Sequence, residues 1–243
     1  MTEAVRGKFI LLEGISGSGK STQAKILSAR LPNAVLNIEP TYDLFGAVVR
    51  AQYMGEKISS EILESCLRYK SDKMGFWPGV HHVISSVLHG VQLSEMEMQL
   101  LFMADRVYDL EKNIFPNLRA DKLVIQDRYL GSTLAYGYSG GLDIEELLRW
   151  QKFAFESSGI AEGSWMPDLM VIFDLDARMA MERLQSSGKP IDMYEQKLER
   201  LQKIREGYQM LVKRSDIAKK IVPVDATRSQ EEITSQLMEL ITV

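Results

Sequence analysis

The sequence predicts an α/β fold in which helices flank a five-stranded parallel sheet. Five short apolar runs, rich in β-branched residues and ending in polar or small ones, are typical of buried strands; they cover residues 8–13, 34–39, 122–127, 169–174 and 220–224. Helical patterns lie between them, at 21–30, 96–113, 144–157, 177–185, 194–214 and 230–241. Because strand and helix alternate, we expect a parallel sheet with its ligands at the carboxyl ends of the strands.

A glycine-rich loop joins the first strand to the first helix. Residues 14–22, GISGSGKST, fit the pattern G-x-x-x-x-G-K-[ST] directly after an apolar run. Glycines let such a loop curl so that its N–H groups point at a phosphate, and the next helix adds its positive dipole end. Lys20 would bridge the β- and γ-phosphates, and the Ser21 hydroxyl would hold Mg²⁺. The pattern predicts a three-layer P-loop NTPase sandwich, with a nucleotide bound by Gly14, Ser16, Gly17, Ser18, Gly19, Lys20, Ser21 and Thr22.

The composition fits a single domain over residues 1–243. Of the 243 residues, 45% are hydrophobic and 26% charged, which is enough to build one sizeable core. The net charge of -4 argues against sequence-independent binding of nucleic acid, because such binding needs a basic surface. No apolar stretch approaches the length of a membrane span, and Cys66 is the only cysteine. We therefore expect no membrane partner, no internal disulfide and a cytoplasmic location.

Residues 55–95 lack a clear strand and favour a helical insertion. The segment carries His81, His82 and His89, which suggest a metal site. Adjacent histidines point to different faces of a helix, however, and no cysteine accompanies them. Ordinary packing or surface histidines are the favoured interpretation.

Asp127 closes the third predicted strand. A P-loop protein commonly keeps an acid at this place to orient Mg²⁺ and its waters. An aspartate at a strand end is by itself more often a cap or turn residue. Arg128 and Tyr129 follow directly, where an anionic acceptor would sit, and they favour the magnesium role.

A series of motifs in one order covers the chain apart from residues 55–95. They lie at 8–23, at Glu39-Pro40 with Gly46 and Arg50, and at 101–106, 127–136, 141–143, 167–169, 182–184, 205–208 and 224–226. In these motifs the sequence resembles the thymidylate kinase family of nucleoside monophosphate kinases. The P-loop alone occurs in many families, whereas Asp127-Arg128-Tyr129 and the pair Phe102 and Arg106 are more selective.

The resemblance implies an acceptor site. Phe102 would stack on a pyrimidine ring and Arg106 would hydrogen-bond its carbonyl, although both could instead be a core side chain and a solvated charge. Arg128 would bind the acceptor phosphate, and Tyr136 would crowd out a ribose 2′-hydroxyl. The implied substrate-binding residues are Glu39, Phe102, Arg106, Arg128, Thr133 and Tyr136.

The resemblance also implies a donor-base site, a lid and an assembly. Arg183 and Ala226 would lie near adenine, and residues 184–195 would form the lid. Relatives commonly pair as homodimers through helices near the one that carries Phe102. Met96, Met98 and Met103 could supply that face, or belong to the core.

Three positions depart from the family pattern. Ser16 stands where many relatives carry an acid, and Ile38 and Met193 stand where many carry an arginine. A transition state without its mobile arginine would lose stabilisation worth several kcal/mol in other systems. Lys189 and Arg68 are the alternatives for the missing charge; lysine offers a point charge in place of a bidentate fork.

The expected activity is ATP- and Mg²⁺-dependent phosphorylation of dTMP to dTDP, with Lys20, Asp127, Arg128 and Lys189 as catalytic residues. A monophosphate offers an oxygen already ionised at neutral pH, so alignment and charge neutralisation suffice. A deoxynucleoside acceptor would need a base, for which Glu13 and Glu39 are candidates. Another monophosphate, a deoxynucleoside, or a regulator without turnover remain alternatives, and a GTPase is disfavoured because no Asn/Thr-Lys-x-Asp stretch occurs.

Overall fold

A computed structural model describes residues 7–188 and 197–242 of the chain. Its sheet has five parallel strands in the order β2-β3-β1-β4-β5. The strands are β1 Phe9–Gly14, β2 Ala34–Ile38, β3 Leu123–Asp127, β4 Leu169–Asp174 and β5 Ile221–Asp225. The predicted fold class is confirmed, and each strand lies within one residue of its predicted bounds.

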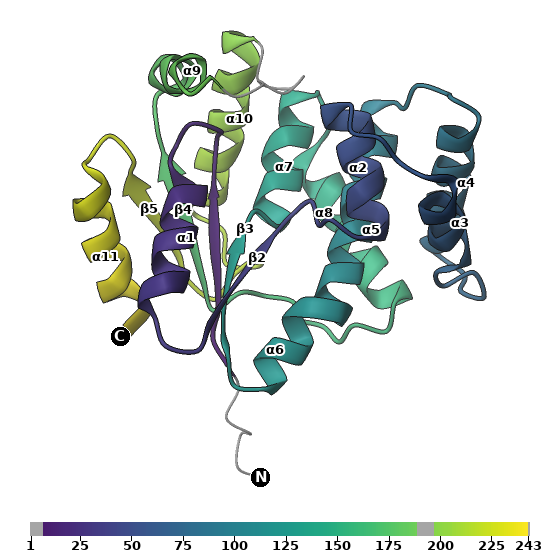
Figure 1. Cartoon of the computed structure of the whole chain (residues 1–243), viewed down its shortest axis with the longest axis horizontal. Helices are drawn as coiled ribbons and strands as arrows, with labels where there is room; N and C mark the ends of the chain where they lie inside the picture. The colour runs from purple at the N-terminus through teal and green to yellow at the C-terminus, as the bar shows by residue number, and fades with distance from the viewer. Residues whose placement is uncertain (1–6, 189–196, 243) are drawn as a thin grey trace.

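Helices cover both faces of this sheet. The helices are α1 Lys20–Arg30, α2 Leu44–Met54, α3 Ser60–Arg68, α4 Trp77–Leu88, α5 Glu95–Asp109, α6 Phe115–Arg119, α7 Leu130–Ser139, α8 Ile144–Ser157, α9 Ala177–Ser186, α10 Leu198–Leu211 and α11 Gln230–Thr242. On one side α1 contacts β1, β2 and β3 and packs on α11. On the other side α7 and α10 pack together and contact β1. Figure 1 shows α11 and α1 in the left half of the view, with α1 drawn over β4, and α7 and α8 in the right half; together with these contacts this gives three layers.

Besides the short α6, the helices α2 and α7 were not among the predicted ones. Both contain glycines, which weaken a helix in isolation. In α7 a Cβ on Gly131 would lie 2.9 Å from a Glu13 carboxylate oxygen, and in α2 a Cβ on Gly46 would lie 2.3 Å from the Thr41 carbonyl oxygen. Because these glycines permit close approach, tertiary packing overrides the weak local helix propensity.

The helix that carries Phe102 is shorter than predicted. A capping box between Ser94 and Glu97 starts α5, whose last residue is Asp109. A π-helical turn, Leu110–Ile114, then leads into α6. The prediction of one continuous α-helix over 96–113 was therefore wrong at its C-terminal end. The helix predicted over 194–214 begins at Leu198 as far as the structure describes it.

The segment 55–95 contains α3 and α4, which Figure 1 places at one end of the molecule beside α2 and α5. Trp77 is fully buried, with its ring centroid 5.8 Å from that of Phe45 and 5.2 Å from that of Tyr69. His81 Nε2 lies 2.9 Å from the Tyr69 carbonyl oxygen. In the ranges that the structure covers, no group of three or more acids, histidines or cysteines is placed to hold a metal ion.

Met98 and Met103, offered above as part of a dimer face, are 7% and 0% exposed and belong to the chain's own core. Across the described residues no helix is long and apolar enough to cross a membrane.

Candidate active site

The glycine-rich loop lies between β1 and α1, at the carboxyl end of the sheet. Gly14, Gly17 and Gly19 have φ values of 146°, 80° and 92°, in the region that favours glycine. At Gly17 a Cβ would also lie 2.7 Å from the carbonyl oxygen of Ala180 in α9. Lys20 is the first residue of α1 and is buried, so its side chain is shielded from bulk water.

Asp127 lies beside that loop. It ends β3, and its Cα pairs with that of Leu12 in the neighbouring strand β1. The residue is 3% exposed, and within the described residues its Oδ1 has no hydrogen-bond partner. A buried carboxylate oxygen without a partner is costly unless a ligand completes it, and oxygen is the ligand that Mg²⁺ prefers. Ser21, exposed on the first turn of α1, offers a hydroxyl of the same kind.

Arg128 connects this loop to the other half of the site. Its backbone has φ 71°, uncommon for a side-chain-bearing residue. Its Nη2 donates to Ser16 Oγ at 2.7 Å and its Nη1 to Ser132 Oγ at 3.3 Å. The guanidinium carbon lies 5.1 Å from the centroid of the Tyr136 ring. Two predicted site residues, Ser16 and Tyr136, are therefore in contact with Arg128.

Glu13 holds the turn that contains Arg128. Its Oε1 accepts hydrogen bonds from the backbone N–H groups of Tyr129 and Ser132, at 2.9 and 3.0 Å. Its Oε2 accepts from Ser132 Oγ at 2.7 Å and from the Tyr208 hydroxyl at 3.0 Å. Burial raises the pKa of this carboxyl group, and the bonds from Ser132 oppose that rise. Both of its oxygens are thus occupied by structural contacts.

Arg106 is the centre of a second buried cluster. Its Nη2 donates to Glu39 Oε2 at 2.7 Å, and its Nη1 donates to Thr133 Oγ1 at 3.0 Å and to Gln151 Oε1 at 2.6 Å. The Tyr129 ring centroid lies 5.0 Å from its guanidinium carbon. Arg106 is only 1% exposed. Three residues predicted for the substrate, Glu39, Arg106 and Thr133, therefore meet at one guanidinium.

Carboxylates outnumber cations in this cluster. Asp105 accepts hydrogen bonds from the Thr41 N–H group at 2.8 Å and the Thr41 hydroxyl at 2.6 Å. Burial raises the pKa of Asp105 to about 7 and that of Asp109 to about 6. Burial also raises the pKa of Glu39 well above its usual value, although Arg106 opposes the rise. The cluster thus favours protonated acids more than an exposed site would.

Phe102 and the donor-base residues complete the arrangement. Phe102 is half-buried, with its ring 6.2 Å from that of Tyr53 in an edge-to-face contact. Arg183 donates from Nη1 to the Ala226 carbonyl at 3.1 Å and to the Gly17 carbonyl at 3.4 Å. The two residues expected near adenine are therefore joined to each other and to the phosphate loop.

The comparisons with known proteins agree with one another. A model of the family described as thymidylate kinase matches residues 80–237. The probable thymidylate kinase of Thermococcus kodakarensis is 32% identical over 96% of this chain and 96% of its own. The chain belongs to the thymidylate kinase family. The thymidylate kinase of Pelotomaculum thermopropionicum is 29% identical over 97% of this chain and 98% of its own.

A solved structure has the same fold. The thymidylate kinase of Candida albicans superposes with a TM-score of 0.68 at 23% identity, covering 99% of this chain and 93% of that one. The full-length overlap extends the thymidylate kinase fold to residues before position 80, where the phosphate loop lies.

The structure describes some of the positions at which the chain departs from the family pattern. Ser16 accepts the hydrogen bond from Arg128 that a carboxylate could also accept. Ile38 ends β2, half-buried, opposite Asp127 of β3. Met193 and Lys189 lie outside the described residues, as does most of the predicted lid. Arg68 lies on α3, exposed, 3.7 Å from Glu64.

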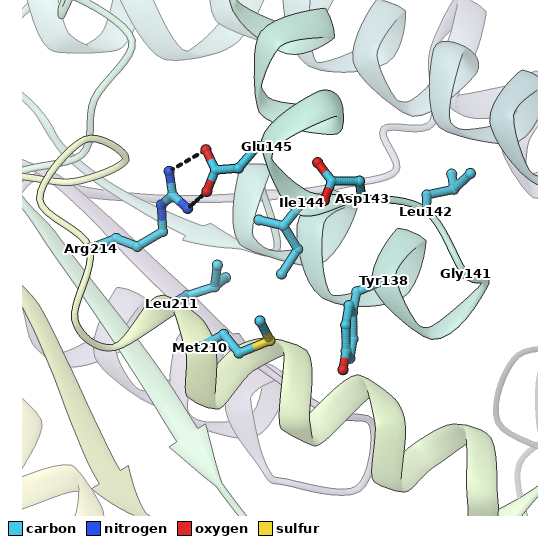
Figure 2. Close-up of a pocket in the computed structure, with 9 residues that line it drawn as sticks. All are labelled: Tyr138, Gly141, Leu142, Asp143, Ile144, Glu145, Met210, Leu211 and Arg214. Atoms are coloured by element: carbon cyan, nitrogen blue, oxygen red, sulfur yellow. Dashed lines mark hydrogen bonds and ion pairs between the residues drawn. The ribbon is translucent and has the colours of Figure 1, made fainter.

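A separate pocket of about 420 Å³ lies among α7, α8 and α10, and none of the predicted site residues lines it. Figure 2 shows its nine lining residues, with Arg214 and Glu145 forming an ion pair at one side. Arg214 also binds Asp216 at 2.8 Å. Arg214, the cation among the lining residues, is already paired with two carboxylates, which leaves an anionic substrate little to bind.

Gln151 is the site residue that the sequence analysis missed. It lies on the buried face of α8 with Leu147, Leu148, Ala154 and Phe155. One polar residue in an otherwise apolar helical stripe is a signal that could have found it.

Proposed function

We propose that this thymidylate kinase family member transfers the γ-phosphoryl group of ATP to dTMP, giving dTDP and ADP. Membership of the family supports the acceptor and the donor. The observation that carries the proposal is the 2.7 Å hydrogen bond from Arg128 to Ser16. It joins a side chain suited to one phosphate to a loop suited to another, as direct transfer between two phosphates requires.

The donor half consists of the glycine-rich loop, Lys20, Arg183 and Ala226. The loop amides and Lys20 would hold the β- and γ-phosphates, because they present fixed positive charge at the start of α1. The contact between Arg183 and the Ala226 carbonyl supports an adenine site at the end of β5.

Mg²⁺ fits residues beside this loop. Asp127, with its unpartnered buried oxygen, and the Ser21 hydroxyl would hold the ion. Bound there, Mg²⁺ would neutralise charge on the donor phosphates and keep them aligned.

The acceptor half is built around Arg128 and Arg106. Arg128 would bind the dTMP phosphate, and Arg106, Phe102 and Thr133 would surround the base. Tyr136, in contact with Arg128, would lie against the sugar and favour a deoxyribose. A monophosphate oxygen is already ionised, so these groups need only align it and offset its charge.

The geometry removes one of the two candidate bases for a deoxynucleoside acceptor. Such an acceptor needs a carboxylate that can take a proton from its hydroxyl. Both oxygens of Glu13 accept structural hydrogen bonds, and Glu39 forms a buried ion pair with Arg106. Glu13 therefore offers no free base, whereas Glu39 keeps Oε1 without a partner among the described residues, so thymidine in the acceptor panel tests Glu39 as a base.

An acceptor panel tests the proposal. We would measure ADP formation in the presence of ATP and Mg²⁺ with each of five acceptors: dTMP, dUMP, dCMP, ribothymidine monophosphate and thymidine. The proposal predicts the highest kcat/KM for dTMP. A higher kcat/KM for another monophosphate or for thymidine would show that dTMP is not the preferred acceptor. ATP binding without transfer to any of the five acceptors would favour a nucleotide-binding regulator without turnover.

The charge expected from the mobile family arginine is assigned here to Lys189. Its support is the sequence alone, since it is the cation in the predicted lid segment. Lys189→Ala should lower kcat more than it raises either KM, because the charge would act mainly in the transition state. Arg68→Ala tests the alternative source of this charge, and it should leave kcat unchanged if Lys189 supplies it.

We further propose a homodimer in the cytoplasm, supported by the family resemblance. Met98 and Met103 are already buried within the chain, so the dimer face would use other residues of the helices near Phe102. Light scattering on the full chain tests the dimer, and cell fractionation tests the location.

A further inference from the structure

The buried guanidinium of Arg106 is held by three acceptors from three elements. Glu39 follows β2, Thr133 belongs to α7 and Gln151 belongs to α8. The shortest of the three bonds runs to Gln151 Oε1, at 2.6 Å. An arginine fixed from three directions can swing little, so these partners decide which of its N–H groups face a ligand.

The hydrogen-bond pattern leaves particular donors for that ligand. The two hydrogens on Nη1 are used by Thr133 and Gln151. Nε of Arg106 is buried and, in the part of the chain that the structure describes, has no acceptor. An unpaired buried N–H group points to a missing acceptor, and a carbonyl oxygen of a base would supply one.

Gln151 itself carries a second unpaired group. The residue is 0% exposed, and its Nε2 has no partner among the described residues. Since Nη1 of Arg106 can only donate, the amide atom that faces it must be the oxygen. An apolar side chain at position 151 would pack on the buried face of α8 without leaving an amide group unpaired. A polar residue here is therefore better explained by Arg106 than by packing.

We propose that Gln151 is a positioning residue that sets base recognition by Arg106. It occupies Nη1 and so turns the remaining donors of the guanidinium toward the base. Donors in that place can donate a hydrogen bond to a pyrimidine carbonyl oxygen at the 4-position, but they face an exocyclic amino group there with another donor. Gln151 therefore favours thymine or uracil over cytosine. The inference rests on the proposed function only for the class of acceptor, a pyrimidine deoxynucleoside monophosphate.

The test uses the full-length chain and two substitutions of Gln151. Gln151→Met keeps the length and shape of the side chain but removes the acceptor, whereas Gln151→Glu keeps an acceptor for Nη1. The measurements are the Kd of dTMP by calorimetry without ATP, the Kd of ATP, and kcat/KM for dTMP and dCMP.

We expect Gln151→Met to weaken dTMP binding about tenfold, to leave ATP binding within about twofold, and to narrow the preference for dTMP over dCMP. Gln151→Glu should keep the dTMP Kd within about threefold of the original protein. Gln23→Met is the matched control: it removes an equally buried amide that bonds Gln230 and Thr234, and it should leave dTMP binding unchanged.

Unchanged dTMP binding in Gln151→Met, or an equal loss of dTMP and ATP binding, would overturn the inference. If Gln151→Met does not fold, Gln151→Glu decides, since loss of dTMP binding there would also overturn it. If the original protein binds a different monophosphate, the proposed function falls, and the same comparison is made with that acceptor. Binding of no monophosphate at all would overturn both.

Discussion

Arg128 donates from Nη2 to the Ser16 hydroxyl at 2.7 Å, and this bond joins the two halves of the candidate site. Ser16 belongs to the loop expected around the donor phosphates, and Arg128 is the arginine expected on the acceptor phosphate. Glu13 holds the turn that contains Arg128, because its carboxylate accepts hydrogen bonds from the N–H groups of Tyr129 and Ser132. The position of Arg128 therefore depends on the donor loop.

Ser16→Ala should weaken dTMP binding more than ATP binding. The substitution removes one hydrogen bond from Arg128 and leaves the loop backbone intact, so we expect a rise of about three- to tenfold in KM for dTMP. Initial rates at saturating ATP measure it. Ser28→Ala on α1, whose hydroxyl bonds the Lys25 carbonyl, is the control and should leave KM unchanged. An unaltered KM in Ser16→Ala would show that the bond has no part in positioning Arg128.

Lys20→Ala should abolish transfer while the protein stays folded. The side chain is buried beside the glycine-rich loop, and its charge is expected on the transferring phosphoryl group. A loss of at least about a hundredfold in kcat is expected, by analogy with other removed electrostatic stabilisers. Circular dichroism confirms folding and coupled ADP detection gives kcat. Wild-type rates in this variant would remove the loop from the mechanism.

Asp127→Asn should change the magnesium dependence. The unpartnered Oδ1 is buried where a cation would gain a ligand, and an amide is a weaker ligand than a carboxylate. We expect the Mg²⁺ concentration at half-maximal rate to rise severalfold, with Tm not reduced. A titration of rate against Mg²⁺ at fixed ATP measures this shift. The same dependence of rate on Mg²⁺ concentration in the original protein and in Asp127→Asn would contradict a role for Asp127 in binding Mg²⁺.

Asp105 should make stability depend on pH. Burial raises its pKa from 3.8 to about 7, so the folded protein binds a proton that the unfolded chain releases. The unfolded state then binds fewer protons between these two values, and stability must fall as pH rises from about 4 to 7. Asp109, with a pKa of about 6, acts in the same direction.

Thermal unfolding of the original protein and of Asp105→Asn measures this effect. We expect Tm of the original protein to fall between pH 5.5 and pH 8, as the folded-state pKa of about 7 requires, and a flatter profile in the variant. Parallel profiles for the two proteins would show that Asp105 does not titrate in this range.

Gly46→Ala should destabilise the protein, because its Cβ would lie 2.3 Å from the Thr41 carbonyl oxygen. Overpacking against backbone costs about 1–3 kcal/mol. Gly79→Ala is the control, since a Cβ there meets nothing within 4 Å and alanine stabilises a helix. Urea unfolding of both variants gives the two free energies. Equal or higher stability in Gly46→Ala would contradict the close contact between α2 and the segment after β2.

The strands and the phosphate loop could be predicted from the sequence because their signals are local. Apolar runs such as 169–174 are buried on both sides, and the spacing of Gly14, Gly19 and Lys20 is itself the loop. Helix α7 could not be predicted this way, since its glycines are poor helix formers and Glu13, distant in sequence, holds its first turn.

The substrate side was predicted through the family resemblance more than through physical signals. Phe102 and Arg106 have ordinary structural explanations on their own. Their partners come from elsewhere in the chain: Glu39 from the end of β2 and Gln151 from α8. A side chain that acts through a contact distant in sequence leaves only an indirect trace, here one polar residue in an apolar stripe.

Transfer of label from ATP carrying radioactive γ-phosphate tests the central claim most directly. With Mg²⁺ and dTMP the full-length chain should place the label in dTDP, one label for each ADP formed, and Arg128→Ala should lose this transfer while still binding ATP. Label released as inorganic phosphate, or found in no nucleotide acceptor of the panel, would contradict direct transfer between two phosphates held at this site.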